Sequence, residues 1–150
     1  MPTPSDPDML YSLIVEIRKA FNDLKNHSDQ EIGDLGLTTS MRAVLEDLDT
    51  GGVQTVPEIA RGQNVTRQHI QQLADSLVAG GFVVYRDNPA HRRSKLLAMT
   101  QKGAATFREI RVRERRALSE ACRSIDSTQL KSSIATLRML RHLLGKRPVE

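Results

Sequence analysis

The sequence predicts a mainly α-helical protein with one small β-hairpin, and three observations support this fold class. Apolar residues recur at spacings of three and four through most of the 150 residues, as expected of amphipathic helices. Two short runs rich in β-formers, 82–86 and 95–99, flank the turn signal Asn88-Pro89. Aromatic residues make up only 3% of the chain, so aliphatic side chains have to build the core of what the length predicts to be a single domain.

The first two helices are predicted within residues 8–52. A helix from Asp8 to about Ser28 follows an irregular lead of residues 1–7, and its apolar stripe consists of Leu10, Leu13, Ile14, Ile17, Phe21 and Leu24. Residues 28–36 are polar and contain two glycines, so a loop is predicted there. Thr38 or Thr39 then caps a second helix, which ends at the glycine pair 51–52. The apolar residues of this second helix are Met41, Val44, Leu45 and Leu48.

Residues 55–81 are predicted to form two helices joined by a tight turn. Thr55 and Glu58 have the spacing of a capping box at the start of the first helix, which Gly62 is predicted to end. Thr66 caps the longer second helix, and the glycine pair 80–81 ends it. The predicted buried side of this helix consists of Ile70, Leu73, Leu77 and Val78. With the hairpin that follows, this order of elements is that of a winged helix-turn-helix lobe.

Two more helices are predicted after the hairpin. Thr100 caps a long helix that runs through Gly103, Phe107 and Ile110 to Ala121. Asp126 and Gln129 have capping-box spacing at the start of the last helix, whose stripe consists of Leu130, Ile134, Leu137, Leu140 and Leu144. A lobe of about 50 residues cannot bury the stripes of both the first and the last helix. We therefore expect these stripes to pack against a second copy of the chain.

Charge is distributed unevenly along the chain. Residues 1–58 hold 4 Lys or Arg and 11 Asp or Glu, whereas residues 59–150 hold 18 and 7. A basic half of this kind is typical of polyanion binders, although a solvated basic surface explains the charge alone equally well. No apolar run approaches the roughly 20 residues that cross a bilayer, and the acidic, Pro-rich N-terminus does not resemble a signal peptide. With a single Cys, these features predict a cytoplasmic protein without an internal disulfide.

The predicted exposed face of the helix that Thr66 caps carries side chains of the types that can contact DNA bases. A major groove about 12 Å wide admits one α-helix, and Arg67 can bind a guanine edge while Gln68, Gln71 or Gln72 can bind an adenine edge. Thr66 and His69 can reach phosphates or bases. Polar residues on a helix are by themselves more commonly its solvated face. The preceding capped helix, the turn and the following hairpin favour DNA reading, because together they form a rigid mount for that face.

The loop between the two predicted strands is the second candidate for DNA contact. Three fixed positive charges fall within four residues at Arg92, Arg93 and Lys95, with Ser94 between them and Arg86 at the end of the first strand. Such a loop can lie over phosphates and insert an arginine into the minor groove, where the negative potential is enhanced. An ordinary solvated turn is the alternative.

The order of elements, the run LADSLVAGGFVVYRDNPAHRRSKLLAMTQKG and the run LTTSMRAVLEDL resemble the MarR (multiple antibiotic resistance regulator) family over about residues 8–145. The resemblance implies a homodimer with dimerisation helices at 8–28 and 103–145 and a DNA-binding lobe at 38–100. It also implies repression from a pseudo-palindromic double-stranded DNA operator, and release by a small anionic or phenolic ligand in many members. It places the recognition helix on residues 66–79 and the wing on residues 85–97.

The resemblance assigns the arginine of the minor groove best to Arg93. The family often has an Asp two residues before this arginine, but His91 stands there, so Asp87 is a candidate substitute and Arg92 an alternative for the minor groove. Members that sense oxidation use a Cys near the start of the chain, which is absent here. Cys122 is therefore predicted to be a buried, inert thiol.

Other function classes find little support in the sequence. The four His have no metal-ligand spacing with one another or with Cys122, so no metal is predicted, and nothing points to a cofactor. No catalytic triad, paired carboxylate site or phosphate loop is recognisable, so we do not expect an enzyme. The leading hypothesis is a repressor that a small ligand releases from DNA. The alternative is a ligand-independent or architectural winged-helix DNA-binding protein.

Overall fold

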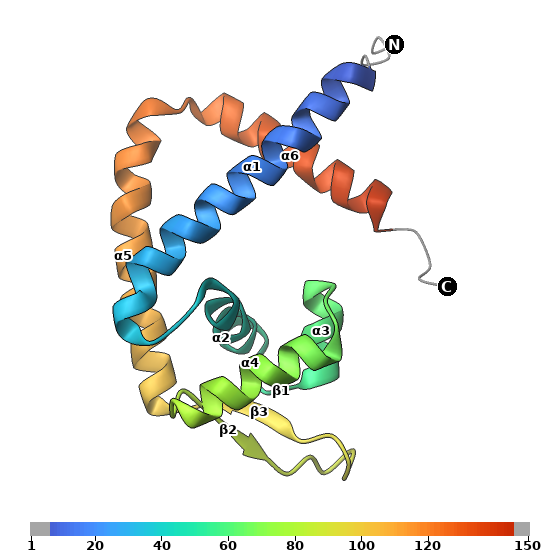
Figure 1. Ribbon diagram of the computed structural model, residues 1–150, viewed down its shortest axis with the longest axis vertical. Coiled ribbons are helices and arrows are strands. Elements are labelled where there is room, and N and C mark those ends of the chain that lie inside the picture. The colour runs from blue at the N-terminus through green and yellow to red at the C-terminus, as the bar shows by residue number, and fades with distance from the viewer. Residues whose placement is uncertain (1–6, 146–150) are drawn as a thin grey trace. The chain divides into compact units, whose positions relative to one another are not determined.

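The computed structural model describes residues 7–145, and most of them are helical (Figure 1). The chain divides into two compact units, one up to Ile110 and one from Arg111 onward. The first unit holds α1 (Pro7–Ile32), α2 (Thr39–Gly51), β1 (Gln54–Thr55), α3 (Val56–Gln63), α4 (Arg67–Ala79), β2 (Val83–Arg86), β3 (Leu96–Met99) and the first half of α5 (Gln101–Ala121). The second unit holds the rest of α5 and α6 (Ser127–Leu144). The irregular lead predicted for residues 1–7 lies outside the described residues, except for Pro7, which begins α1.

The predicted β-hairpin is confirmed, and a third strand joins it. The sheet is antiparallel with the order β1-β3-β2. Val83 pairs with Met99 at the base of the hairpin, and Arg86 pairs with Leu96 near its tip. The unpredicted strand, β1, is only two residues long, which is too short to produce an alternating pattern. It ties the start of α3 to the sheet, because Thr55 is both the last residue of β1 and the N-cap of α3.

The helix-turn-helix is formed by α3 and α4, as predicted. The Thr55 side chain accepts a hydrogen bond from the Glu58 N–H, and the Glu58 carboxylate accepts one from the Thr55 N–H at 2.7 Å, which completes the capping box. The bond from the Thr55 N–H, together with one that the Thr55 hydroxyl donates to the same carboxylate at 2.8 Å, lowers the pKa of Glu58. The predicted end of α3 at Gly62 is wrong by one residue. Asn64, at a φ of 55°, takes the left-handed position that ends the helix.

Helix α4 starts and ends where the sequence predicts. The Thr66 hydroxyl accepts a hydrogen bond from the His69 N–H, and Gly80 follows the last helical residue. Ile70 and Leu77 are fully buried, as is Ala74, which the predicted set omitted. The predicted residues Leu73 and Val78 are partly buried and pack against the same core. One face of α4 is therefore fixed in the core, and the opposite face is exposed.

The end of α1 and the loop after it differ from the prediction. The helix continues past Ser28 to Ile32, and a 3-10 turn, η1 (Gly33–Leu35), takes up most of the predicted loop. Ile32 is buried in the core, with 1% of its surface exposed, and this burial stabilises helical structure in a stretch whose polar composition favours a loop. The Asp29 carboxylate also accepts hydrogen bonds from the N–H and hydroxyl of Thr39, at 2.7 and 2.6 Å, and these bonds lower its pKa.

The first half of α5 is anchored to the base of the hairpin. Thr100 donates its N–H to the Phe82 carbonyl, and its hydroxyl donates to the Gly81 carbonyl while accepting from the Gly103 N–H. Gly103 packs so closely here that an added Cβ would collide with the Phe82 carbonyl oxygen and come within 2.9 Å of Met99 Cγ. Lys102 reaches back to the Gly80 carbonyl at 2.7 Å.

In the second unit, a 3-10 turn, η2 (Cys122–Ser124), leads to α6. Asp126 caps α6 by accepting from the N–H groups of Thr128 and Gln129, but the return bond of a full capping box is not formed among the described residues. Cys122 is exposed, so the prediction of a buried thiol is wrong for this chain. The reason is that the end of α5 buries none of its side chains within the chain.

The apolar stripes of α1 and α6 are largely uncovered in the single chain. Phe21 and Leu24 on α1 keep 66% and 68% of their surface exposed, and α6 has no buried residue. The α6 stripe is exposed at Leu130, Ile134, Leu137 and Leu144, and half-buried at Leu140. No helix within residues 7–145 is both long enough and apolar enough to span a membrane.

The close approach of Gly103 to the hairpin predicts the effect of a single methyl group. Gly103→Ala is expected to lower the free energy of unfolding by about 1–3 kcal/mol, because the Phe82 carbonyl is backbone and cannot move aside. Gly62→Ala is the matched control, since a Cβ there meets nothing within 4 Å and the residue is helical. This control is expected to gain about 0.5–1 kcal/mol. Urea denaturation of both variants measures the difference, and equal stabilities would contradict the packing described here.

Candidate nucleic-acid interface

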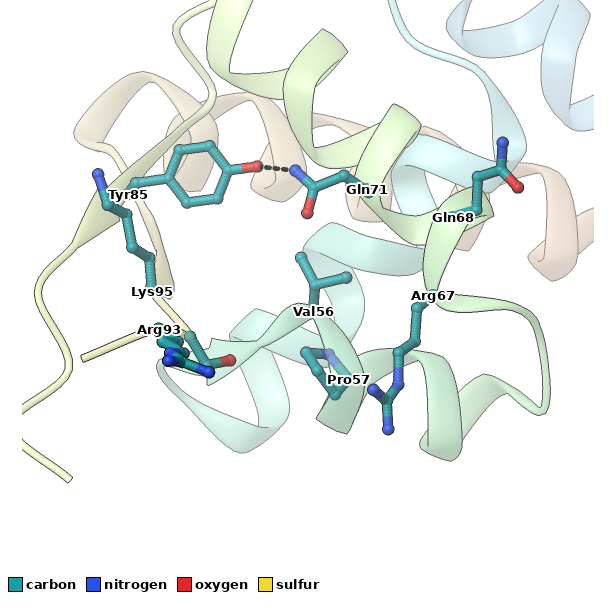
Figure 2. Close-up of a pocket in the computed structure, with 9 residues that line it drawn as sticks. Val56, Pro57, Arg67, Gln68, Gln71, Tyr85, Arg93 and Lys95 are labelled. Carbon is teal, nitrogen blue, oxygen red and sulfur yellow. Dashed lines mark hydrogen bonds between the residues drawn. The ribbon is translucent and has the colours of Figure 1, made fainter. Parts of the chain in front are cut away.

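The exposed face of α4 and the wing border an open cleft of about 530 Å³. Figure 2 shows Tyr85, Arg93 and Lys95 on the wing side, and Arg67 and Gln68 on the α4 side. The remaining lining residues are Val56, Pro57, Gln71 and Ser94. Val56 and Pro57 come from the first turn of α3, so all three parts of the winged helix contribute to the cleft.

The cleft is lined by three cationic side chains, Arg67, Arg93 and Lys95, and by no carboxylate among its nine described residues. None of these three cations takes part in an ion pair within residues 7–145. Their charges are therefore available to a partner. Because the N-terminus of α4 adds the partial positive charge of its free N–H groups, the surface is suited to an anion.

The predicted site residues fall into two groups. Arg67, Gln68, Gln71, Arg93, Ser94 and Lys95 are brought together in the cleft. Thr66, His69, Gln72, Arg86 and Arg92 are exposed but do not line it. Between the two arginines proposed for the minor groove, Arg93 is thus the one that faces α4 across the cleft. Asp87, the candidate partner for it, forms no ion pair with either arginine in the described chain.

The wing loop is compact. The Asn88 side chain accepts a hydrogen bond from the Ala90 N–H at 3.1 Å, and the Asn88 carbonyl accepts one from the His91 N–H at 3.2 Å. The His91 carbonyl in turn accepts from the Ser94 N–H at 3.2 Å. Two successive turns therefore hold the cationic stretch, and these backbone bonds supply order where no carboxylate steadies the arginines.

A hydrogen-bonded group that links α4 to β2 was not predicted from the sequence. The Gln71 amide donates to the Tyr85 hydroxyl at 2.6 Å, as Figure 2 shows, and to Asp75 Oδ1 at 2.9 Å. The Tyr85 hydroxyl donates to the same Asp75 oxygen at 2.9 Å. Burial, together with the hydrogen bond to Asp75, raises the pKa of Tyr85. The spacing of Gln71 and Asp75 was visible as an i, i+4 pair, but nothing local places Tyr85 beside them.

Within residues 7–145, no three or more His, Cys, Asp or Glu side chains gather in a way that could hold a metal ion.

Known proteins resemble this chain in sequence and in fold. A sequence model described as the MarR family matches residues 35–94, from the end of η1 to the wing loop. An uncharacterized protein of Mycobacterium tuberculosis is 36% identical over 95 residues. That alignment covers 63% of this chain and 66% of the relative, so the chain spans about two thirds of the length of this curated relative.

Solved structures extend the likeness to most of the chain. A MarR family transcription regulator, SP03579, superposes with a TM-score of 0.81 at 25% identity, over 93% of this chain and 95% of that one. A mutant of Escherichia coli MarR complexed with operator DNA has a TM-score of 0.79 at 20% identity, over 91% and 99%. An organohalide-sensing regulator bound to 2,4-dichlorophenol has a TM-score of 0.79 at 18% identity, over 95% and 86%.

The last two likenesses concern the fold alone. The family match, by contrast, falls on the residues that build the helix-turn-helix and the wing. From the sequence of that lobe and the fold around it, we conclude that the chain belongs to the MarR family of DNA-binding transcriptional regulators.

Proposed function

We propose that the chain is a homodimeric transcriptional repressor that binds a pseudo-palindromic operator in double-stranded DNA. The observation that carries this proposal is the cleft between α4 and the wing. Its described lining includes three cations and no carboxylate, and it borders an exposed polar helix face. DNA has the complementary chemistry, since its phosphates attract the cations while its base edges offer partners to Arg and Gln side chains.

The proposed division of roles follows from where each side chain lies. Arg67 and Gln68, in the first turn of α4, contact base edges in the major groove. Thr66, His69 and Gln72, which are exposed but do not line the cleft, contact phosphates or bases. Arg93 enters the adjacent minor groove, and the rest of the wing holds the DNA backbone through Arg86, Arg92, Ser94 and Lys95.

A dimer is proposed because the chain leaves much apolar surface uncovered. Residues 8–28 and 103–145 would form the dimerisation region, and residues 38–100 the DNA-binding lobe. The support is the exposed stripes of α1 and α6, which contain large side chains such as Phe21 and Leu144. A two-fold pair would also present two copies of α4 to half-sites about one DNA turn apart, which is what a pseudo-palindrome offers.

The proposal includes a response to a small ligand. A small anionic or phenolic ligand would release the repressor from DNA, and the dichlorophenol-bound regulator of similar fold favours this. A ligand-independent or architectural DNA-binding protein is the second candidate. A thermal-shift screen with small aromatic acids and phenols distinguishes the two candidate functions, because a ligand selective for the native state raises the melting temperature. For either candidate we propose a cytoplasmic, non-enzymatic protein.

Arg93→Ala is expected to weaken binding to most duplexes and to reduce the slope of log affinity against log salt by about one per subunit, because one phosphate-region charge is lost. Titrations of an operator duplex at several salt concentrations, followed by fluorescence anisotropy, measure both quantities. Arg123→Ala, at an exposed position in η2, removes the same charge and serves as the control. Equal effects of the two variants would contradict the proposed role of the wing.

Gln68→Ala is expected to change which duplexes are preferred. A bidentate contact to adenine is worth about 1–3 kcal/mol of discrimination, so the preference at one base pair in each half-site should fall roughly tenfold to a hundredfold. In vitro selection of bound duplexes with parent and variant measures this change. If parent and variant select identical motifs, Gln68 does not contact a base.

Leu137→Glu is expected to convert the dimer to a monomer and to weaken operator binding, because it places a charge in the proposed interface. Ala135→Glu adds the same charge on the other side of α6 and is the matched control. Light scattering after size-exclusion chromatography distinguishes one chain of 16.8 kDa from two. A parent protein that runs as a single chain would rule out the dimer directly.

A further inference from the structure

The hydrogen-bonded group of Gln71, Asp75 and Tyr85 joins the two elements that are proposed to contact DNA. Gln71 and Asp75 lie one turn apart on α4, and Tyr85 lies on β2. Tyr85 pairs with Leu97 across the hairpin, and its ring packs partly buried against the core. The chain runs from Tyr85 through Arg86 directly into the cationic loop. A constraint on Tyr85 is therefore a constraint on the wing.

The donor and acceptor chemistry of the three side chains determines how they are bonded. An ionised carboxylate only accepts, so Asp75 receives one hydrogen bond from the Gln71 amide and one from the Tyr85 hydroxyl. With its single hydrogen used in this way, the Tyr85 oxygen accepts the third bond, from the amide nitrogen of Gln71. The three bonds close a ring, which we call the α4–β2 ring, and each side chain in it has two partners.

The amide nitrogen of Gln71 is hydrogen-bonded to both Asp75 and Tyr85. Bidentate recognition of adenine requires one amide donor and the amide oxygen together. Turning the Gln71 amide toward adenine would therefore compete with its hydrogen bonds to Asp75 and Tyr85. Gln68, on the same face one turn earlier, differs in this respect, because its amide forms no hydrogen bond with any other described side chain.

We propose that Gln71 is a positioning residue, which together with Asp75 and Tyr85 fixes the wing against the recognition helix, and that it does not read a base itself. This inference rests on the proposed function, and it narrows the adenine-reading candidates on α4 to Gln68 and Gln72. The ring would set the separation between the two DNA-contacting elements before DNA arrives, so that less conformational freedom is lost on binding.

The first experiment compares the base preferences of variants. Operator duplexes obtained by in vitro selection are substituted one base pair at a time, and the affinities of parent, Gln71→Ala, Tyr85→Phe and the double variant are measured. Each single variant removes two of the three bonds of the ring but leaves the DNA-contacting side chains in place. A loss of about threefold to tenfold in affinity is therefore expected, evenly across the duplexes. The double variant is expected to lose little more than the weaker-binding single variant, because both changes open the same ring.

Gln68→Ala is the matched control in this experiment, since it removes the same kind of side chain from the same helix. Its loss of preference should be confined to one base pair in each half-site. If Gln71→Ala behaves like this control while Tyr85→Phe leaves the preferences unchanged, Gln71 reads a base and the inference is overturned.

The second experiment detects the ring without DNA. The chain has two Tyr and no Trp, so Tyr11→Phe leaves Tyr85 as the only group that gives a tyrosinate absorbance. In this background, Asp75→Asn is expected to lower the pKa of Tyr85, because it removes a negative charge beside the hydroxyl. Gln71→Ala is expected to raise that pKa further, because it removes a donor to the phenolate. A role in fold stability alone would not produce opposite shifts.

The two experiments separate failure of the inference from failure of the proposed function. If the parent binds DNA sequence-specifically but the pKa of Tyr85 is unchanged in Asp75→Asn and Gln71→Ala, the inferred ring is wrong and the proposed function stands. A parent that shows no salt-dependent binding to any duplex would overturn the proposed function, and the positioning role would fall with it.

Discussion

The close approach of α5 to the start of β2 is the constraint on which the DNA-binding lobe depends. At this joint, Thr100 donates hydrogen bonds to the carbonyls of Gly81 and Phe82, and Gly103 leaves room for the Phe82 carbonyl. Helix α4 ends immediately before these residues and β2 begins immediately after them. The joint therefore determines the direction in which the wing leaves α4. A side chain at position 103 would force backbone apart, and no change of rotamer could relieve it.

A second connection between α4 and the hairpin lies about two turns earlier on the helix. There the α4–β2 ring joins Tyr85 to Gln71 and Asp75, so that β2 is held to α4 at two separate points. The cationic residues project beyond these points, from the first turn of α4 and from the wing loop. These two connections hold the positively charged side chains of α4 and the wing near one another, although no carboxylate lines the cleft between them. The core supplies the stabilisation that the surface itself lacks, since Ile70, Leu77 and Val83 are fully buried behind it.

Features that depend on a few neighbouring residues could be predicted well. The caps at Thr55, Thr66 and Asp126 follow from hydrogen bonds that span two or three residues, so the sequence contains both partners side by side. Errors arose where distant packing outweighs local preference. The predicted loop at 28–36 is mostly helical because Ile32 is buried, and β1 exists because β3 offers it a partner. The prediction of a buried Cys122 rested on residue type and on the position of the sensing Cys in the family. Neither takes account of how little of α5 is covered within one chain.

The sequence by itself determined the order of helices and strands, the basic second half and the set of side chains able to contact DNA. It did so because periodicity, capping and charge are properties of residues close together in the chain. Only the tertiary structure decided which of those side chains share a cleft, that Arg93 rather than Arg92 faces α4, and that the Gln71 amide is already occupied by Asp75 and Tyr85. The reason is that Tyr85 lies fourteen residues from Gln71, on a different element, and only the fold brings the two together.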